Sequence, residues 1–390
     1  MSKQVDIAVI GGGVVGLSAA LAMVLRGYSV ALIDAGSMNP DITQPEARVY
    51  AINQASQNLL NQLGVWSNLQ PSRLSPYRQM YVWDAANGAH IEFDARMIAA
   101  ERLGTIIEES VLRKALLQAL SLQKSNFTLF ANTKINQVET EQDCIKIAGE
   151  GFHCQAQLLM IADGANSPCR DLLKVSMTSW PYHQEALVAL VNTEKSHQQT
   201  AYQIFNTDGP LAFLPMVDEK LCSIVWSTTA GRVKELMSLA DEEFNKELTE
   251  AFAAKLGQAK VVGKRSQFPL IMRHAQSYTG SRWLLLGDAA HTIHPLAGLG
   301  LNVGLADVAT WLSCLDRSKQ LNSQRVLGAY QRQRKHEVWK IIAMMDGLKT
   351  IFGYSLPPMV SLRGIGLRLC NGFSPLKQLF IEQATGLRSG

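Results

Sequence analysis

The chain has 390 residues, of which 47% are hydrophobic and 18% are charged, and its formal net charge is +4. These values are those of an ordinary globular protein that is long enough for two closely joined domains. Because no apolar run reaches about 18 residues, we expect no membrane-spanning helix. We also expect no nucleic-acid partner.

The six cysteines form neither a C-x-x-C pair nor a metal-ligand pattern, so we expect free thiols in a reducing compartment. The apolar N-terminus is similar to a signal sequence, but Asp6 and the triple glycine at 11–13 interrupt it. We therefore expect a cytoplasmic protein that is not exported.

Residues 5–34 have the pattern of a strand, a tight turn, a helix and a second strand. The β-branched run 5–10 ends in three glycines, and an alanine- and leucine-rich segment follows at 17–26. A second apolar run, 29–34, ends in an aspartate. This order is typical of the first unit of a dinucleotide-binding sheet.

Four residues of this unit are candidate cofactor ligands. Gly11 would allow the turn, Gly13 would let the backbone approach a diphosphate, and Gly16 would let the helix pack closely on the strand. Asp34, at the end of the second strand, could accept hydrogen bonds from a ribose. The unit predicts a dinucleotide, but it does not distinguish FAD from a nicotinamide nucleotide.

The next part of the chain predicts a helix at 53–63, a hairpin at 80–93 and an amphipathic helix at 109–120. Short strands follow, and the last of them, 158–161, ends at Asp163. Ligands bind outside the carboxyl ends of strands in such sheets, so this turn is a candidate site. Arg48 fits either a cofactor contact or an exposed surface position.

Residues 186–269 are rich in predicted strands and contain one predicted helix, 241–256. We interpret them as a sheet that covers the substrate. Its candidate substrate contacts are apolar or aromatic, although each also fits the ordinary core of a sheet. They are Tyr202, Phe213, Pro215 and Trp226.

A buried strand at 283–286 then returns to the nucleotide-binding unit and ends at Asp288. A glycine-containing segment, 298–302, leads into a predicted helix at 303–315. Two strand, loop and helix units of this kind suit one elongated cofactor, with phosphates at one helix N-terminus and a ring at the other. His291 and His294 have no third ligand beside them, so we expect no metal.

Residues 317–390 predict helices at 324–351 and 359–369 and carry 12 Lys and Arg against 3 Asp and Glu. An anionic membrane surface, an acidic partner or a solvated helix face would each fit this charge. We assign 1–185 and 270–320 to a nucleotide-binding domain with a β-rich insertion near 75–105. Residues 186–269 form the covering sheet, and 321–390 form a C-terminal helical segment.

Taken in order, these motifs resemble the FAD-dependent aromatic hydroxylases and, within them, the ubiquinone-biosynthesis group. The resemblance is closest to the 2-octaprenylphenol hydroxylases that act at ring carbon 5. The segments that carry the resemblance are 11–16, 48–53, 64–66, 162–167, 213–215, 221–227 and 286–302. The resemblance implies an α/β fold of mixed α+β character: a Rossmann-like FAD-binding domain interleaved with a β-sheet substrate domain, followed by helices.

The resemblance also implies roles for individual residues. Gly11, Gly13 and Gly16 would hold the diphosphate, and Asp34 would hold the adenosine ribose. Arg48, Arg113 and Asp163 would approach the cofactor, and Asp288 would bond its ribityl chain. The remaining candidates would border the flavin ring: Pro295, Gly298, Gly300, Leu301 and Asn302. The family usually has Gln where this chain has Leu299.

The activity implied is hydroxylation of a polyprenylated phenol by O2 through a C4a-hydroperoxide of the flavin, with NAD(P)H as reductant. A multi-enzyme ubiquinone-synthesis complex and the inner membrane surface are candidate partners. No residue is assigned as catalytic acid or base. The alternatives are an isoprenoid-lipid reductase, a halogenase, whose Trp-x-Trp-x-Ile motif is missing, and a prenyl-binding protein without flavin. Bound flavin would separate the last from the others.

Overall fold

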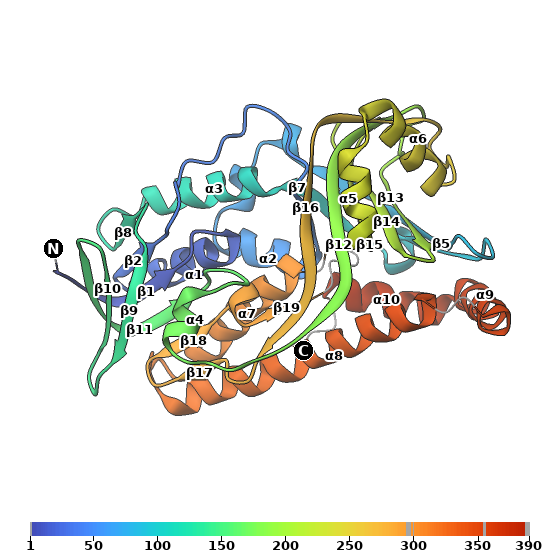
Figure 1. Ribbon diagram of the computed structural model, residues 1–390. Helices are drawn as coiled ribbons and strands as arrows, with labels where there is room; N and C mark the ends of the chain where they lie inside the picture. The colour runs from blue at the N-terminus through green and yellow to red at the C-terminus, as the bar shows by residue number, and fades with distance from the viewer. Residues whose placement is uncertain (1, 294–297, 299, 354–355, 387–390) are drawn as a thin grey trace.

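The computed structural model describes residues 2–293, 298, 300–353 and 356–386. Two large β-sheets, a small third sheet and a set of C-terminal helices make up the architecture. In Figure 1 the first sheet lies on the side of the N-terminus, the second lies on the opposite side, and the long helix α8 runs along both. The predicted mixed α/β class, with a Rossmann-like unit interleaved with a second sheet, is confirmed.

The first sheet is built on five parallel strands in the order β18-β11-β1-β2-β8. Their bounds are Trp283–Leu285, Phe152–Ile161, Ser2–Ile10, Val30–Ile33 and Phe127–Phe130. The antiparallel strands β17 (Thr279–Gly280), β10 (Ile145–Gly149) and β9 (Ile135–Thr140) extend it. Because helices cover its central strands, these strands are apolar runs rather than alternating ones.

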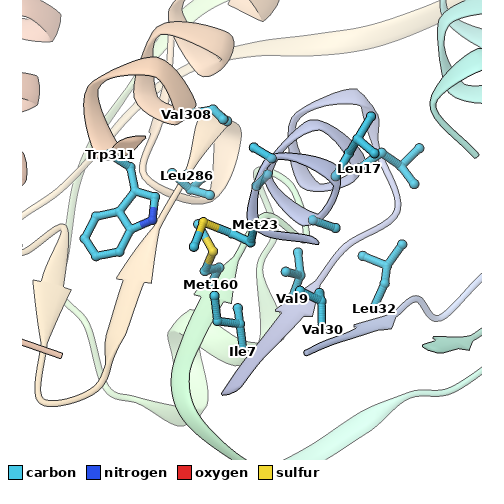
Figure 2. Close-up of a cluster of buried hydrophobic side chains, with 14 of the residues drawn as sticks. Ile7, Val9, Leu17, Met23, Val30, Leu32, Met160, Leu286, Val308 and Trp311 are labelled. Atoms are coloured by element: carbon cyan, nitrogen blue, oxygen red, sulfur yellow. The ribbon is translucent and has the colours of Figure 1, made fainter. Parts of the chain in front are cut away.

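Helix α1 (Val14–Val24) packs between this sheet and two further helices, α3 (Glu109–Ser121) and α7 (Gly300–Asp316). Figure 2 shows part of the resulting core, in which Met23 of α1 lies on the side of the strands, and Leu17 and Trp311 belong to the same cluster. Nearly every residue of α1 is buried, which is why its sequence is apolar on all sides.

Several short elements complete this half of the molecule. The third sheet, which was not predicted, has the order β3-β7-β4. Its strands are Val49–Ile52, Gly104–Glu108 and Ser75–Tyr77. The short helices are α2 (Gln54–Gln62) and α4 (Pro168–Leu172), with 3-10 turns at Trp66–Asn68, Pro71–Arg73, Ala95–Ile98 and Gly287–Ala289.

The second sheet has eight strands in the order β19-β16-β12-β15-β14-β13-β5-β6. Their bounds are His291–Thr292, Ala259–Ala275, Met177–Thr193, Leu221–Thr229, Gly209–Pro215, Thr200–Asn206, Gln79–Asp84 and His90–Asp94. Strands β12 and β16 have 17 residues each, so the sheet extends beyond the predicted 186–269 at both ends. It also takes β5 and β6 from the predicted insertion near 75–105.

Two helices, α5 (Ala230–Ser238) and α6 (Asp241–Ala251), pack against one face of the second sheet. Helix α5 was not predicted, because only Val233 and Leu236 of it are buried and so few apolar residues give no helical period. The opposite face of the sheet is left to face the nucleotide-binding half.

Helices α8 (Gln324–Gly353), α9 (Pro357–Gly372) and α10 (Ser374–Thr385) end the described chain. The first two confirm predicted helices, and α10 was not predicted. Arg363 fixes α9 to strand β5, because its guanidinium donates to both oxygens of Asp84 at 2.7 and 3.0 Å. Within the described part of the chain, every helix is too short or too polar to cross a membrane.

Candidate functional site

A cavity of about 1020 Å³ lies between the first sheet and the free face of the second. Its walls include the first glycine turn, strand β3, the loop after β11, the turn after β18 and the start of α7. The glycine turn, the loop after β11 and the turn after β18 follow the carboxyl ends of parallel strands, where α/β sheets bind ligands. The volume is at the upper end of the roughly 300–1,000 Å³ usual for ligand sites, which suits a large cofactor together with a substrate.

The three glycines of the first turn do three different things. A Cβ atom at Gly16 would lie 1.9 Å from the carbonyl oxygen of Gly11, so only glycine lets α1 pack this closely. Gly11 has a φ of +107°, and a Cβ there would lie 2.2 Å from the oxygen of Ala162. Gly13 is different, because no atom lies within 4 Å of the position that its Cβ would take.

Gly13 lines the cavity together with the first residues of α1, and as the N-cap it offers no side-chain hydrogen bond to that helix. The first amides of α1 are therefore left without an intrahelical acceptor at the cavity wall. Such an end binds anions, because the amides and the helix dipole both favour negative charge. The open space at Gly13 fits the approach of a diphosphate.

Asp34 and Arg113 lie on either side of the same turn. The Asp34 carboxylate accepts hydrogen bonds from the amides of Gly12 at 2.5 Å and Gly36 at 2.7 Å. Arg113 donates from Nε to the Gly12 carbonyl oxygen at 3.1 Å. Both residues thus hold the glycine turn in shape, and neither is part of the cavity wall. Their predicted direct contacts with the cofactor stay predictions.

Arg48 projects into the cavity and is mostly exposed there, next to Glu109, with which it forms an ion pair. The Tyr50 hydroxyl donates to the same carboxylate at 3.1 Å. Burial raises the pKa of Tyr50 above its usual value, although the charge of Arg48 opposes the shift. The Tyr50 hydroxyl is therefore an uncharged hydrogen-bond donor at physiological pH. The guanidinium of Arg48 offers N–H donors to the cavity.

Asp288 lies on the turn after β18 and presents its side chain to the cavity. The side chain is accessible from the cavity, but protein atoms surround the carboxylate on its other sides. This partial desolvation raises the pKa of Asp288. Nearby His291 and Arg48 oppose the shift. A carboxylate without strong local partners at the cavity wall is suited to accept hydrogen bonds from hydroxyl groups of a ligand.

Asp163 follows β11, between the cavity-lining residues Ala162 and Gly164. Its Oδ2 atom accepts a hydrogen bond from the Cys169 amide at 3.2 Å. Its buried Oδ1 atom has no hydrogen-bond partner among the described residues, and burial raises the pKa of the carboxyl. A buried polar atom without a partner costs free energy, so this oxygen fits a contact that a bound ligand would complete.

The predicted flavin-ring contacts divide into two groups. Gly298, Gly300 and Leu301 line the cavity. Asn302 does not, because its side chain donates to the Ala51 oxygen at 2.7 Å and accepts from the Asn53 amide at 3.0 Å. It therefore ties α7 to strand β3. Pro295, His294 and Leu299 lie outside the described residues.

Of the predicted substrate contacts, only Tyr202 borders the cavity, and its ring packs on Phe252, on the other face of the second sheet. Phe213 is fully buried on the other face of the second sheet, where its ring stacks on Phe252 at 3.7 Å. Trp226 belongs to the same core cluster, and Pro215 is buried outside the cavity wall. The prediction is corrected for these three, because side chains alternate between the two faces of a strand.

The residues that do face the cavity are the neighbours of the predicted ones along the same strands. Ala212 and Leu214 flank Phe213, while Val225 and Ser227 flank Trp226. Other apolar residues of the wall are Tyr77, Met80, Val188, Leu190, Ala201, Phe268, Leu270 and Ile271. This wall is mostly apolar, in contrast to the amides and carboxylates of the opposite side.

The described residues fit a bound FAD. The amides at Gly13 and the Asp288 carboxylate form a polar wall, and Gly300 leaves open space where a Cβ would point. The buried, unpartnered Asp163 oxygen belongs to the residue between the wall residues Ala162 and Gly164. Within the described ranges, no three His, Cys, Asp or Glu side chains are grouped closely enough to hold a metal ion.

Comparison with known proteins gives matches over nearly the whole chain. The family described as FAD binding domain matches residues 4–345. The 3-demethoxyubiquinol 3-hydroxylase of Escherichia coli (strain K12) is 33% identical over 393 residues, which cover 99% of this chain and 100% of that protein. The mitochondrial ubiquinone biosynthesis monooxygenase COQ6 of Xenopus tropicalis is 31% identical, with 97% of this chain and 93% of that protein covered.

Among solved structures, the p-nitrophenol 4-monooxygenase PnpA from Pseudomonas putida DLL-E4 is similar, with a TM-score of 0.81. The match covers 100% of both chains at 16% sequence identity. At that identity the likeness extends to the fold alone.

Proposed function

The chain belongs to the FAD binding domain family and is an FAD-dependent monooxygenase, and we propose that it hydroxylates the ring of a polyprenylated phenol in ubiquinone biosynthesis. The two curated relatives described above are a ubiquinol-precursor hydroxylase and a ubiquinone-biosynthesis monooxygenase by name. The proposal covers this group of reactions rather than the single ring position of the 2-octaprenylphenol hydroxylases.

The observation that carries the proposal is the division of the cavity into a polar and an apolar wall. The polar wall suits the phosphates and ribityl chain of FAD. The apolar wall of the second sheet, with small side chains such as Ala201 and Ala212, leaves room for an aromatic ring with an isoprenoid tail. A small charged or sugar-like substrate would leave this wall poorly covered.

Reduced by NAD(P)H, bound FAD would supply the activation of O2 and the transfer of one oxygen atom to the ring. The oxygen-transfer route expected from the resemblance is part of this proposal. The chain's own residues have three tasks. The α1 amides hold the diphosphate, Asp288 accepts from the ribityl hydroxyls, and the apolar wall excludes water while it orients the ring.

The apolar wall can be tested with a pair of neighbouring residues that face opposite sides of strand β14. Ala212→Trp should fill the substrate side of the cavity, so FAD content should stay near that of the wild type. Hydroxylation should fall at least about tenfold, equivalent to roughly 1.4 kcal/mol in the barrier, while NAD(P)H oxidation continues with release of peroxide. The measurement is product formed and peroxide released per NAD(P)H consumed.

The matched control is Phe213→Leu, which removes volume from the core on the other face. It should lower thermal stability, by about 1 kcal/mol or more, with little change in the ratio of product to NAD(P)H. If Ala212→Trp hydroxylates a prenylphenol as well as the wild type does, the second sheet does not bind the substrate.

Helix α9 supports a peripheral contact with a membrane. Leu362, Ile365 and Leu369 are spaced as one helical face, yet they are 63%, 55% and 67% exposed. The opposite face is fixed by Arg363, which pairs with Asp84, and by Gly364, which packs against Asn87. The apolar face therefore points away from the protein.

We propose that this face of α9 binds an anionic lipid surface. The proposed substrate carries a tail that dissolves in a bilayer, and residues 317–390 have 12 Lys and Arg against 3 Asp and Glu. Apolar area and basic charge together are the features of an interfacial helix. Assembly with other enzymes of the same pathway is the competing outcome.

Replacing Leu362 and Leu369 by Glu should reduce binding to phosphatidylglycerol-containing vesicles by more than about tenfold, because two buried leucines stabilise insertion by roughly 1.5–3 kcal/mol each. Leu122→Glu is the matched control, since Leu122 is 78% exposed but lies at the end of α3. Co-sedimentation with vesicles measures the effect. Equal binding by both variants, or binding by neither variant nor the wild type, would contradict the lipid contact and favour a protein partner.

A further inference from the structure

A network of buried charges lies directly behind the Gly287–Ala289 turn, on the side away from the cavity. Its centre is Asp307 of helix α7, which is fully buried. Its other members are the Gly287 amide, the His291 ring and the guanidinium of Arg334 on helix α8. None of these residues was predicted from the sequence to contact the cofactor, and only Gly287 is part of the cavity wall.

The contacts of Asp307 are short and leave neither carboxylate oxygen without a partner. Oδ2 accepts from the Gly287 amide at 2.7 Å and lies 2.8 Å from His291 Nε2. Oδ1 accepts from Arg334 Nε at 2.6 Å. One carboxylate thus joins the start of the turn, the first residue of β19 and helix α8.

Helix α8 holds both flanks of the turn. Arg334 also donates from Nη2 to the Val303 oxygen at 3.0 Å and forms an ion pair with Glu337. One helical turn earlier, the Tyr330 hydroxyl donates to the oxygen of Leu285, the last residue of β18, at 2.8 Å. The strand that leads into the turn and the helix beside it are therefore fixed by the same element.

The charge state of Asp307 follows from these partners. Burial alone would raise its pKa, but His291 and Arg334 outweigh this effect, so the pKa lies below the usual range. The carboxylate is therefore ionised at neutral pH. A buried charge of this kind depends on all its partners, because the removal of one leaves it uncompensated in a medium of low dielectric constant.

The turn itself has little freedom to adjust. Gly287 has a φ of +57°, and helix α7 packs closely against it at Gly304, where a Cβ would lie 3.2 Å from the Gly287 Cα atom. Asp288 is the next residue, and its carboxylate faces the cavity. A shift of the Gly287 amide would therefore move the Asp288 carboxylate by a similar amount.

We propose that Asp307 and Arg334 are positioning residues for the cofactor, which act by holding the Gly287–Ala289 turn in the orientation that presents Asp288 to bound FAD. The inference goes beyond the proposed function, because it concerns binding of the cofactor and does not depend on the substrate. It also gives the C-terminal helix a part in the cofactor site, although α8 contributes no residue to the cavity wall.

The competing explanation is that the network only braces α7 against α8. Arg334→Lys separates the two, because lysine keeps the charge but cannot make the Nε and Nη2 contacts together. Its matched control is Arg363→Lys, which disturbs the buried pair between Arg363 of α9 and Asp84, near the C-terminal end of α8. Both variants should lower the unfolding temperature of the protein.

Only Arg334→Lys should lose affinity for FAD, by about tenfold, as expected for misplaced hydrogen bonds to a charged group. Arg363→Lys should stay within about twofold of the wild type. The measurements are FAD retained by the holoenzyme on dilution, followed by flavin fluorescence, and thermal unfolding of the same samples with FAD removed.

A second pair of variants covers the case in which Arg334→Lys folds poorly. Asp307→Asn keeps an oxygen that can accept from the Gly287 amide, whereas Asp307→Ala does not, so Asn should retain clearly more FAD than Ala. The proposal is overturned if Arg334→Lys keeps wild-type FAD affinity, if Arg363→Lys loses as much, or if the two Asp307 variants retain FAD equally.

Discussion

Gly13→Val is expected to weaken FAD binding by at least about 100-fold in affinity, while the fold stays intact. The position of a Cβ at Gly13 has no atom within 4 Å, so the protein itself has space for the side chain. That space is the part of the cavity wall where the α1 amides would meet a diphosphate. The added methyl groups would separate the phosphates from the amides, and a loss of about 2.7 kcal/mol corresponds to the hundredfold change.

Two other glycines serve as controls for this experiment. Gly231, in the first turn of α5, also has open space around its Cβ position but lies far from the turn in sequence and outside the cavity wall, so Gly231→Val should leave FAD binding unchanged. Gly16→Ala should instead disrupt folding, because its Cβ would collide with the Gly11 oxygen. FAD released on denaturation, per mole of protein, and circular dichroism measure the two effects. Wild-type FAD content in Gly13→Val would contradict the assignment of the diphosphate site.

Asp288→Ala is expected to weaken FAD binding by about 10- to 150-fold, since a hydrogen bond to a charged acceptor contributes roughly 1.5–3 kcal/mol. The same change should make the FAD-free protein more stable at neutral pH. Burial raises the pKa of Asp288, so its ionised form is disfavoured in the folded protein relative to the unfolded chain.

The sign of this second effect gives a pH test. A carboxyl group whose pKa is raised by folding contributes stability at a pH below its pKa in the unfolded chain, which is about 3.9 for Asp. This contribution is lost as the pH rises through the pKa of the folded protein. The free energy of unfolding of the variant, relative to that of the wild type, should therefore increase as the pH rises to neutrality. The difference between the two proteins should be smaller in acid. Thermal unfolding of FAD-free protein against pH measures it. Normal FAD binding by the Asp288→Ala protein would show that Asp288 does not contribute to the cofactor site.

The first nucleotide-binding unit could be predicted in detail because its signals are local. Strand β1, helix α1 and strand β2 follow from an apolar run, three glycines and a second apolar run, and each is confirmed within a few residues. The separate roles of Gly11 and Gly16 were also predicted, since both concern contacts between elements that adjoin in sequence.

The substrate side could not be predicted to the same depth. Strand β14 contains Ala212, Phe213 and Leu214. Because side chains alternate between the two faces of a strand, neighbours must face opposite sides, but the sequence does not indicate which side faces the cavity. The aromatic residue was the natural choice, but helix α6 brings Phe252 and its neighbours to that face. The smaller neighbours were left to line the cavity, where their size provides the space.

The Asp307 network was missed for a related reason. Asp307 lies in a mostly apolar helix, and its partner Arg334 is 27 residues further on, in a helix that the charge pattern marked only as basic. Nothing in the sequence indicates that one of those basic residues is buried beside a carboxylate. Only the packing of α8 along α7 brings the two charges together.

Hydroxylation of a prenylated phenol by this chain with FAD and O2 can be followed with isotopically labelled oxygen. The holoenzyme is supplied with NAD(P)H, a polyprenylphenol in detergent and ¹⁸O₂, and the product is analysed by mass spectrometry. We expect one ¹⁸O atom in the new hydroxyl group of the product ring and one NAD(P)H consumed for each product formed. A product that carries oxygen only from water, or flavin-dependent NAD(P)H oxidation that yields peroxide and leaves every prenylphenol unchanged, would contradict it.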